Sequence, residues 1–490
     1  MSTGTTSPAP TPVTGTGRTV ALVVILLASF MDLLDVTIVN ITLPSVENDL
    51  GASSAQLQWM LTGYTLAFAL GIITGARLGD LFGYKRTFLV GIAGFTIASA
   101  LCGGAPTAEA LVVARIVQGL FAAAMVPQVL SQIQVMYAPH ERGGAMAAFS
   151  SLSGLAAAAG PILGAALLEA DWFGQGWRAV FWINVPVGAL ALAAALMVLP
   201  EARGATRPRL DAVGMLLSAA GLVLILYPLI KGSAERPWPL WTYPSMAVGI
   251  AVLAVFVRHQ RSLSARSRSP LIETGLFRIR SVGGGLLVQF LFFLPVMGFF
   301  LTFMQLLQPG LGMTPMKAGL TILPWPIATT VAAGLGAAVL LPRLGRTTVQ
   351  IGIVVLAAGF VLLAATATDA THDTGVLAFL PGVIVGGAGM GLTVAPLAQL
   401  TLEEVPAVHA ASGSGLFNTV AQLAASVGVA VIGTVFFSRL TGHSGPALDR
   451  YTTAYGATLW ASLLLLAATL AASFLLPHKK KASEQVSSPT

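Results

Sequence analysis

The sequence contains little charge and a single cysteine. Charged residues make up 9% of its 490 residues and hydrophobic residues 55%, whereas ordinary soluble domains are roughly 25% charged. So little charge excludes a soluble fold and favours a protein that crosses a membrane many times. Because Cys102 has no second cysteine to pair with, an intramolecular disulfide and a cysteine-rich metal site are excluded as well.

Apolar runs recur along almost the whole chain. A helix needs about 20 apolar residues to cross a hydrocarbon core of roughly 30 Å, and these runs are long enough. Hydropathy and turn residues predict an all-α fold with fourteen transmembrane helices, of which the eighth is short, over residues 19–41, 56–76, 87–105, 110–132, 143–167, 178–200, 211–230, 245–258, 281–305, 316–341, 348–368, 375–400, 412–437 and 453–476.

Lysine and arginine concentrate on one side of the expected membrane. If both termini are cytoplasmic, 19 of the 26 basic residues lie in cytoplasmic segments, six lie outside, and Arg115 lies within a span. Basic residues are enriched in the cytoplasmic loops of membrane proteins, so this bias predicts cytoplasmic termini and a location in the cell membrane. It also explains the net charge of +7 without a nucleic-acid partner.

Composition also divides the chain into segments. The first residues are uncharged and rich in serine, threonine, proline and glycine, which is typical of a disordered tail and lacks the basic start of a signal peptide. Polar and basic stretches set off an extra helix pair in the middle. We expect a cytoplasmic tail at 1–17, a six-helix bundle at 18–200, a linker with two additional helices at 201–280, a second six-helix bundle at 281–476, and a basic cytoplasmic tail at 477–490.

Two carboxylates, Asp32 and Asp35, stand in the first apolar run. A carboxylate near the bilayer centre costs roughly 2.5–3.5 kcal/mol on insertion scales, so it normally faces a bundle interior or a wet cavity. Residues three apart lie within roughly 60° of each other on a helix, so both can face one cavity. Helix rise places Asp35 and Arg115 each about 8 Å below the outer surface, which allows them to pair.

These charges have two interpretations. A paired, buried carboxylate can take a proton from one side of the membrane and release it to the other, which favours Asp35 with Arg115, and also Asp32, as a proton-coupling group. Alternatively, the charges only lock helices together, and Arg115 clamps backbone carbonyls. The sequence leaves both interpretations open.

Several amides also lie in the expected spans. They can contact a ligand in a cavity, or they can join helices by hydrogen bonds of about 0.6 kcal/mol each. The fourth span carries three of them, with two on the Arg115 side. The candidates for the substrate cavity are Asp32, Gln118, Gln132, Gln289, Asn418 and Gln422, and further amides occur at Gln128, Asn184 and Gln305.

A loop motif follows the second span. The stretch "GARLGDLFGYKR" (75–86) resembles the cytoplasmic loop signature of the major facilitator superfamily, matched at Gly75, Gly79, Asp80, Gly83, Lys85 and Arg86. Glycine permits a tight turn and close helix contact, and an aspartate beside basic residues can form a breakable latch.

Two further motifs resemble the same superfamily. The stretch "LVVARIVQGLFAAA" (111–124) is similar to its fourth-helix motif, and "GLAAAAGPILG" (154–164) to its fifth-helix antiporter motif. Small residues one turn apart let a neighbouring helix approach closely, and a proline can bend the helix near its outer end, where a gate would lie. The antiporter motif implies export rather than uptake, and the matching residues are Arg115, Gln118, Gly119, Gly154, Gly160, Pro161 and Gly164.

The first helix narrows the resemblance. The stretch "LDVTIVNITLP" (34–44) resembles the signature of the fourteen-span drug:proton antiporter branch, as do "LQWMLTGYTLAFA" (57–69) and "GSGLFNTVAQLAASVG" (413–428). This resemblance covers nearly all of residues 20–476. It implies the major facilitator fold, with Asp35 as the proton-coupling acid and Arg115 as its partner.

The chain also departs from the branch. The tenth expected span lacks an acid, Glu403 and Glu404 stand at a helix end, and "PRLGRT" (342–347) keeps the glycine and arginines of the loop signature without its aspartate. These departures favour a neutral or singly charged amphiphile over a dication as substrate.

We therefore expect a monomeric alternating-access antiporter in membrane lipid, which exchanges amphiphilic drugs or antibiotics for protons. No nucleotide-binding loop is visible, so neither ATP nor another cofactor or metal is predicted. Proton-coupled uptake of a small organic nutrient is the alternative, because fold does not determine function. An enzyme is not predicted, since the six histidines lie in or near loops and lack catalytic spacing.

Overall fold

The computed structural model describes residues 16–137, 141–202, 211–232, 239–266, 270–271, 274–405, 410–442 and 445–477. Most of the expected tails, 1–17 and 477–490, lies outside these ranges, as does 203–210 of the expected linker. The described residues form helices and short connections, with no β-strand among them. The all-α prediction is confirmed.

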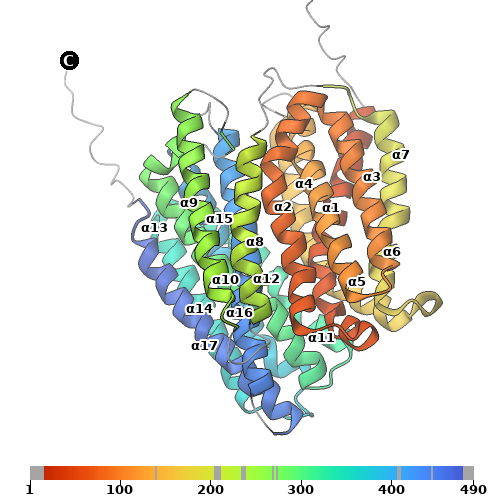
Figure 1. Ribbon diagram of the computed structural model, residues 1–490, viewed down its shortest axis with the longest axis vertical. Helices are drawn as coiled ribbons and strands as arrows, with labels where there is room; N and C mark the ends of the chain where they lie inside the picture. The colour runs from red at the N-terminus through yellow and green to blue at the C-terminus, as the bar shows by residue number, and fades with distance from the viewer. Residues whose placement is uncertain are drawn as a thin grey trace, which may run out of the picture. The chain divides into compact units, whose positions relative to one another are not determined.

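The chain divides into two compact units, Met1–Ala219 and Ala220–Thr490, and the boundary falls inside helix α8. Each unit contains tightly packed long helices (Figure 1). The expected separation of 201–280 as a linker between two bundles stays a prediction.

The first unit contains helices α1 to α7 and the first part of α8 (Figure 1). Side-chain caps fix several helix starts. Ser53 and Gln56 form a capping box before α2, and the Thr107 hydroxyl accepts a hydrogen bond from the Ala110 amide at the start of α4. The elements are α1 (Thr16–Leu50), α2 (Ser54–Phe82), α3 (Tyr84–Gly103), α4 (Ala108–Met136), α5 (Arg142–Ala170), η1 (Trp172–Gly174), η2 (Gly176–Arg178), α6 (Ala179–Trp182), α7 (Asn184–Val198) and α8 (Ala212–Gly232).

The second unit contains the remainder of α8 and all later elements. Its core is a stack of aromatic rings, in which Phe299 lies 4.8 Å from Trp325, 5.0 Å from Phe303 and 5.3 Å from Phe360 between ring centroids. The elements are α9 (Thr242–Ala265), η3 (Thr274–Arg278), α10 (Arg280–Gln305), η4 (Leu306–Gly310), α11 (Pro315–Ile322), α12 (Pro324–Leu335), η5 (Gly336–Leu340), α13 (Leu341–Leu344), α14 (Thr347–Thr368), α15 (Val376–Leu402), α16 (Ala410–Gly442) and α17 (Ala447–Ser473).

The expected transmembrane spans are present. Among the described residues, 13 helices are long and apolar enough to cross a membrane, and α5 occupies the place of the fourteenth with a shorter apolar segment, Ala159–Ala170. The eighth span is longer than expected, because α9 continues beyond its apolar run to Ala265. The tenth span is broken at Pro324, which lacks an amide hydrogen to continue α11, and again at the π-helical turn η5.

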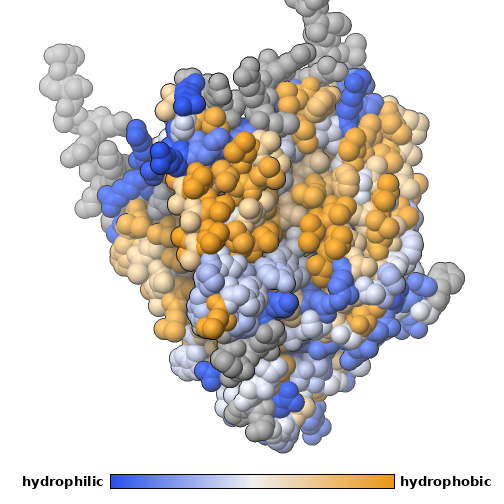
Figure 2. All heavy atoms as spheres, viewed as in Figure 1, coloured by the Kyte–Doolittle hydropathy of each residue, from blue (hydrophilic) through white to orange (hydrophobic). Residues whose placement is uncertain are grey.

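The outer faces of the helices are apolar. Val90, Ile97 and Leu101 of α3 are all more than half exposed, as are Val248 and Ile250 of α9. Figure 2 shows hydrophobic side chains gathered over these two helices. Apolar side chains exposed along a helix with internally satisfied backbone groups suit a lipid environment, so the chain is a multi-pass membrane protein.

Helices α2 and α4 approach each other closely through glycine. A Cβ added to Gly75 would lie 2.0 Å from the Ala123 carbonyl oxygen, and one added to Gly119 would lie 2.4 Å from the Tyr64 carbonyl oxygen. Small residues at such contacts allow helix backbones to meet, which is the main source of packing energy between helices in lipid.

Replacing Gly75 by alanine is expected to destabilise the protein by about 1–3 kcal/mol, the usual cost of overpacking, because the Ala123 carbonyl is a backbone atom that cannot rotate away. Thermal unfolding of the purified protein in detergent measures the change. Gly456→Ala in α17 is the matched control, since no atom lies within 4 Å of its added Cβ. Equal melting temperatures for both variants would contradict the close contact.

Candidate functional site

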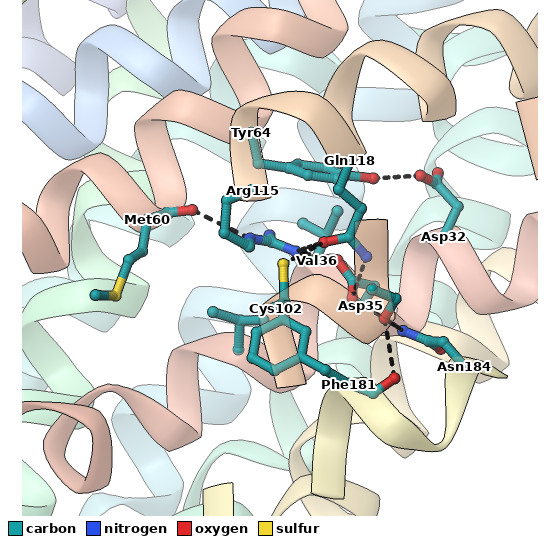
Figure 3. Close-up of polar contacts among 12 residues, drawn as sticks. Asp32, Asp35, Val36, Met60, Tyr64, Cys102, Arg115, Gln118, Phe181 and Asn184 are labelled. Atoms are coloured by element: carbon teal, nitrogen blue, oxygen red, sulfur yellow. Dashed lines mark hydrogen bonds and ion pairs between the residues drawn. The ribbon is translucent and has the colours of Figure 1, made fainter. Parts of the chain in front are cut away.

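Asp35 is fully buried in α1 and is held by side chains from α4 and α7 (Figure 3). Arg115 Nη1 donates to Asp35 Oδ2 and forms an ion pair with it. Asp35 Oδ1 accepts hydrogen bonds from Gln118 Nε2 at 3.0 Å and from Asn184 Nδ2 at 3.1 Å. A cation and two neutral donors thus satisfy both carboxylate oxygens, as a buried charge requires. The structure therefore contains the ion pair between Asp35 and Arg115 that their equal depth in the membrane allowed.

Arg115 is held from other directions as well. Its Nε donates to the Met60 carbonyl oxygen at 3.3 Å, and its Nη1 donates to Gln118 Oε1 at 2.8 Å. The guanidinium carbon lies 4.2 Å from the centroid of the Tyr64 ring. A planar guanidinium can bind a carboxylate along its edge and an aromatic ring on its face at once. Arg115 therefore combines the two contacts that the sequence left as alternatives, an ion pair and a backbone clamp.

Asp32 has a different environment one helical turn before Asp35. The Tyr64 hydroxyl donates a hydrogen bond to Asp32 Oδ1 (Figure 3). Asp32 retains an exposed fraction of 6%, whereas Asp35 has none. Two aspartates on one helix therefore differ in their partners, because a cation neutralises Asp35 while a neutral donor contacts Asp32.

A second layer of polar groups orients the amides around Asp35. Asn184 Nδ2 also donates to Ser99 Oγ at 3.0 Å, and the Ser99 hydroxyl donates to the Phe181 carbonyl oxygen at 2.9 Å. The Cys102 thiol lies 3.5 Å from Gln118 Oε1. Sequence reasoning missed Ser99. The available signal was the spacing of Ser99 and Cys102, three residues apart in an otherwise apolar run.

The glycines of the fifth-helix motif contact the helix that carries Asp35. A Cβ added to Gly160 would lie 1.9 Å from Thr37 Oγ1, and one added to Gly164 would lie 2.7 Å from Ile38 Cγ1. Thr37 in turn donates to the Leu34 carbonyl oxygen at 3.0 Å. The first-helix and fifth-helix motifs are therefore two sides of one contact, just beyond Asp35. Pro161 and Gly154 also lie within α5.

The loop motif lies at the end of the first unit where α2 meets α3. Gly83 separates the two helices with a φ of 101°, a conformation that favours glycine. Asp80 accepts a hydrogen bond from the Tyr84 hydroxyl at 3.0 Å, and Arg86 lies 3.9 Å from Glu201. Gly79 faces Gln128, whose amide oxygen would lie 2.0 Å from an added Cβ.

The remaining amides of α4 lie away from Asp35. Gln128 Nε2 donates to the Gly75 carbonyl oxygen at 2.8 Å and therefore joins α4 to α2. Gln132 Nε2 lies 3.5 Å from the Pro200 carbonyl oxygen. The structure brings Gln118 to Asp35 but leaves Gln132 at the other end of the helix.

The amides expected to line the cavity in the second unit lie on α10 and α16. Gln289 is buried, and its Oε1 has no hydrogen-bond partner among the described residues. Gln305, also on α10, is buried with neither amide atom bonded in the described part of the chain. Asn418 is exposed and Gln422 is partly buried on α16. Their contact with a substrate stays a prediction.

Residues 25–429 match the Major Facilitator Superfamily. The chain belongs to this superfamily of membrane transporters. The match covers the whole Asp35 site and ends within α16, at residue 429.

Three relatives from Streptomyces species resemble the chain over most of its length. A probable actinorhodin transporter of Streptomyces coelicolor is 43% identical over 432 residues, which are 88% of this chain and 75% of the relative. The puromycin resistance protein pur8 of Streptomyces alboniger is 34% identical over 95% of this chain and 93% of its own. A tetracenomycin C resistance and export protein of Streptomyces glaucescens is 33% identical over 86% and 76%.

Solved structures of the superfamily share the fold. The POT family transporter PepTSo matches with a TM-score of 0.67 at 13% identity, over 94% of this chain and 99% of its own. A bacterial homolog of the human lysosomal transporter Spinster matches with a TM-score of 0.65 at 18% identity, over 94% and 97%. At these identities the likeness establishes the major facilitator fold alone.

Replacing Arg115 by methionine is expected to cost about 3–5 kcal/mol of stability, because the Asp35 carboxylate stays buried without its cation. The double variant Asp35→Asn/Arg115→Met should recover most of this loss, since it removes both charges. Thermal unfolding of the two single variants and the double variant measures the coupling energy. Losses that simply add would show that the ion pair is not their source.

Proposed function

We propose that this transporter is a proton-coupled efflux antiporter that exports amphiphilic drugs or antibiotics across the cell membrane by alternating access. The supporting observation is the fully buried Asp35 carboxylate, which pairs with Arg115. Asp35 lies on α1, the helix that packs against Gly160 and Gly164 of α5. Asp35 can thus exchange a proton, and a change in its charge can act on the contact between α1 and α5.

Export is the direction that the relatives support. The names of the three relatives describe an actinorhodin transporter, a puromycin resistance protein and a tetracenomycin C resistance and export protein. We transfer this activity to the chain as efflux of antibiotics or other amphiphilic drugs. The transporter works as a monomer in membrane lipid, without a cofactor.

Proton coupling follows from the chemistry of the Asp35 pair. When a proton from the outside binds Asp35, the negative charge that holds the Arg115 guanidinium disappears, and the two amides lose their charged acceptor. The affinity for a bound drug then falls and the drug leaves to the outside. Release of the proton to the cytoplasm restores the pair and the drug-accepting state.

The contacts at the ends of the first unit support cytoplasmic termini. Arg18, near the start of α1, donates to Glu141 before α5 at 2.7 Å, and Lys85 at the start of α3 donates to the Leu196 carbonyl oxygen at 2.8 Å. These basic residues therefore share the end of the unit at which the chain enters. At the opposite end, Arg178 pairs with Asp49. The excess of basic residues at the entry end favours the cytoplasmic side for it.

The proton gradient supplies enough free energy for this exchange. A membrane potential of about 100 mV contributes ~2.3 kcal/mol per proton, and each pH unit contributes about 1.4 kcal/mol. Exchange of one proton for one neutral drug can therefore sustain roughly a hundredfold drug gradient, at 1.4 kcal/mol per decade.

Replacing Asp35 by asparagine is expected to abolish proton-driven efflux, because the side chain can no longer exchange a proton. The protein should stay folded, since an asparagine oxygen can still accept a hydrogen bond from Arg115. Drug-induced proton release from purified protein, measured over a compound panel, tests coupling, and size-exclusion chromatography checks folding. Full proton release by this variant would remove Asp35 as the coupling acid. Accumulation rather than exclusion of test drugs by cells that contain the unmodified protein would instead favour uptake.

Replacing Asp32 by asparagine is expected to weaken export of cations more than that of neutral drugs, because Asp32 retains some exposure and lacks a cationic partner among the described residues. The measurement is the ratio of kcat/KM for tetraphenylphosphonium, a fixed cation, to kcat/KM for neutral chloramphenicol. We expect this ratio to fall about tenfold, because the cation loses one charge-assisted contact. An equal loss for both compounds would argue against recognition of charge at Asp32.

A further inference from the structure

Tyr64 contacts Asp32, one of the two acidic groups of α1, and Arg115, the partner of the other. It is 2% exposed on α2. Its hydroxyl donates to Asp32, and its ring lies under the Arg115 guanidinium at 4.2 Å (Figure 3). One side chain thus contacts Asp32 directly and reaches Asp35 through Arg115.

The Tyr64 side chain is fixed in this place by its surroundings. Its ring is parallel to that of Phe68, with an interplanar angle of 6° and centroids 6.4 Å apart. The backbone beside it is equally constrained, because a Cβ added to Gly119 of α4 would lie 2.4 Å from the Tyr64 carbonyl oxygen. Contacts of both the ring and the backbone thus limit how far Tyr64 can follow a displaced partner.

The two contacts of Tyr64 have separate chemical origins. The hydroxyl stabilises a charged Asp32 carboxylate by donating a hydrogen bond. The ring face attracts the Arg115 cation through its quadrupole, an interaction that strengthens when water is excluded. A hydroxyl that donates to an anion also increases the electron density of its ring, so the charge on Asp32 strengthens the attraction between Tyr64 and Arg115.

We propose that Tyr64 is a positioning residue that couples the two aspartates, by holding Asp32 with its hydroxyl and Arg115, the partner of Asp35, with its ring. This inference rests on the proposed antiport function and adds a physical link between substrate charge and proton coupling. A cation bound at Asp32 withdraws charge from the hydroxyl and weakens the attraction of the ring for Arg115, so the guanidinium pairs more closely with Asp35 and favours release of the Asp35 proton.

Two substitutions separate the contacts. Tyr64→Phe keeps the ring and removes the hydroxyl, whereas Tyr64→Leu removes both. For Tyr64→Phe we expect the KM for tetraphenylphosphonium to rise about tenfold with kcat and chloramphenicol export nearly unchanged, because one hydrogen bond to a charged group is lost. For Tyr64→Leu we expect the same rise in KM and, in addition, a fall of about tenfold in drug-induced proton release, because the ring that contacts Arg115 is lost. Tyr64→Phe keeps this ring, so its proton release should stay within about twofold of that of the unmodified protein.

A double variant provides the decisive comparison. If the hydroxyl acts through Asp32, the KM of Asp32→Asn/Tyr64→Phe for tetraphenylphosphonium should lie within about twofold of that of Asp32→Asn alone, since interacting sites are not additive. Tyr137→Phe is the matched control, because the centroid of the Tyr137 ring also lies 4.6 Å from an arginine guanidinium, that of Arg18, while Tyr137 follows the end of α4 and Arg115 lies near its start. This control should transport like the unmodified protein.

The possible failures are distinguishable. Effects of Tyr64→Phe and Asp32→Asn that multiply, or an unchanged KM in Tyr64→Phe, would overturn the positioning role while leaving antiport intact. Absence of drug-induced proton release from the unmodified protein would overturn the proposed function and this inference together. Because Tyr64→Phe removes a single oxygen, its result stands even if Tyr64→Leu fails to fold.

Discussion

The buried ion pair between Asp35 and Arg115 is the interaction on which the first unit depends. Removing two charges from water costs several kcal/mol per ion even after relaxation, so the pair is tolerated only if the surrounding groups satisfy its remaining donors and acceptors. Gln118, Asn184 and the Met60 carbonyl supply these contacts from three different helices. The demand of one ion pair therefore fixes how α1, α2, α4 and α7 meet.

Close helix contact is the second requirement, because hydrogen bonds of this length cannot span a loose bundle. Gly119 brings α4 against α2 beside Tyr64, and Gly160 brings α5 against α1 beside Thr37. Gly119 lies one turn after Arg115 on α4, and Thr37, which Gly160 contacts, lies two residues after Asp35 on α1. A change in the charge of Asp35 therefore acts on helices that are already in backbone contact, and a small shift of one must displace the next.

The sequence could predict elements and depths but not directions around a helix. Apolar runs gave the fourteen spans, and helix rise alone placed Asp35 level with Arg115. The same reasoning grouped Gln132 with Gln118, yet fourteen residues along a helix separate them by about 21 Å, which puts Gln132 beside Pro200 instead. The roles of Ser99 and Tyr64 depend on which way α3 and α2 are rotated, and hydropathy does not determine rotation. The last two turns of α9, residues 259–265, were missed because they are polar and extend beyond the apolar run.

The two units differ in how they hold their polar groups. In the described part of the second unit, acids occur only at or beyond helix ends, as at Asp369, Glu404 and Asp449. Two of its buried amides, Gln289 and Gln305, have amide atoms without a hydrogen-bond partner among the described residues, unlike the amides that surround Asp35. An amide side chain does not titrate, so in the proposed mechanism the response to a proton originates in the first unit. The core of the second unit is instead built from stacked aromatic rings such as Phe299, Trp325 and Phe360, none of which carries a titratable group.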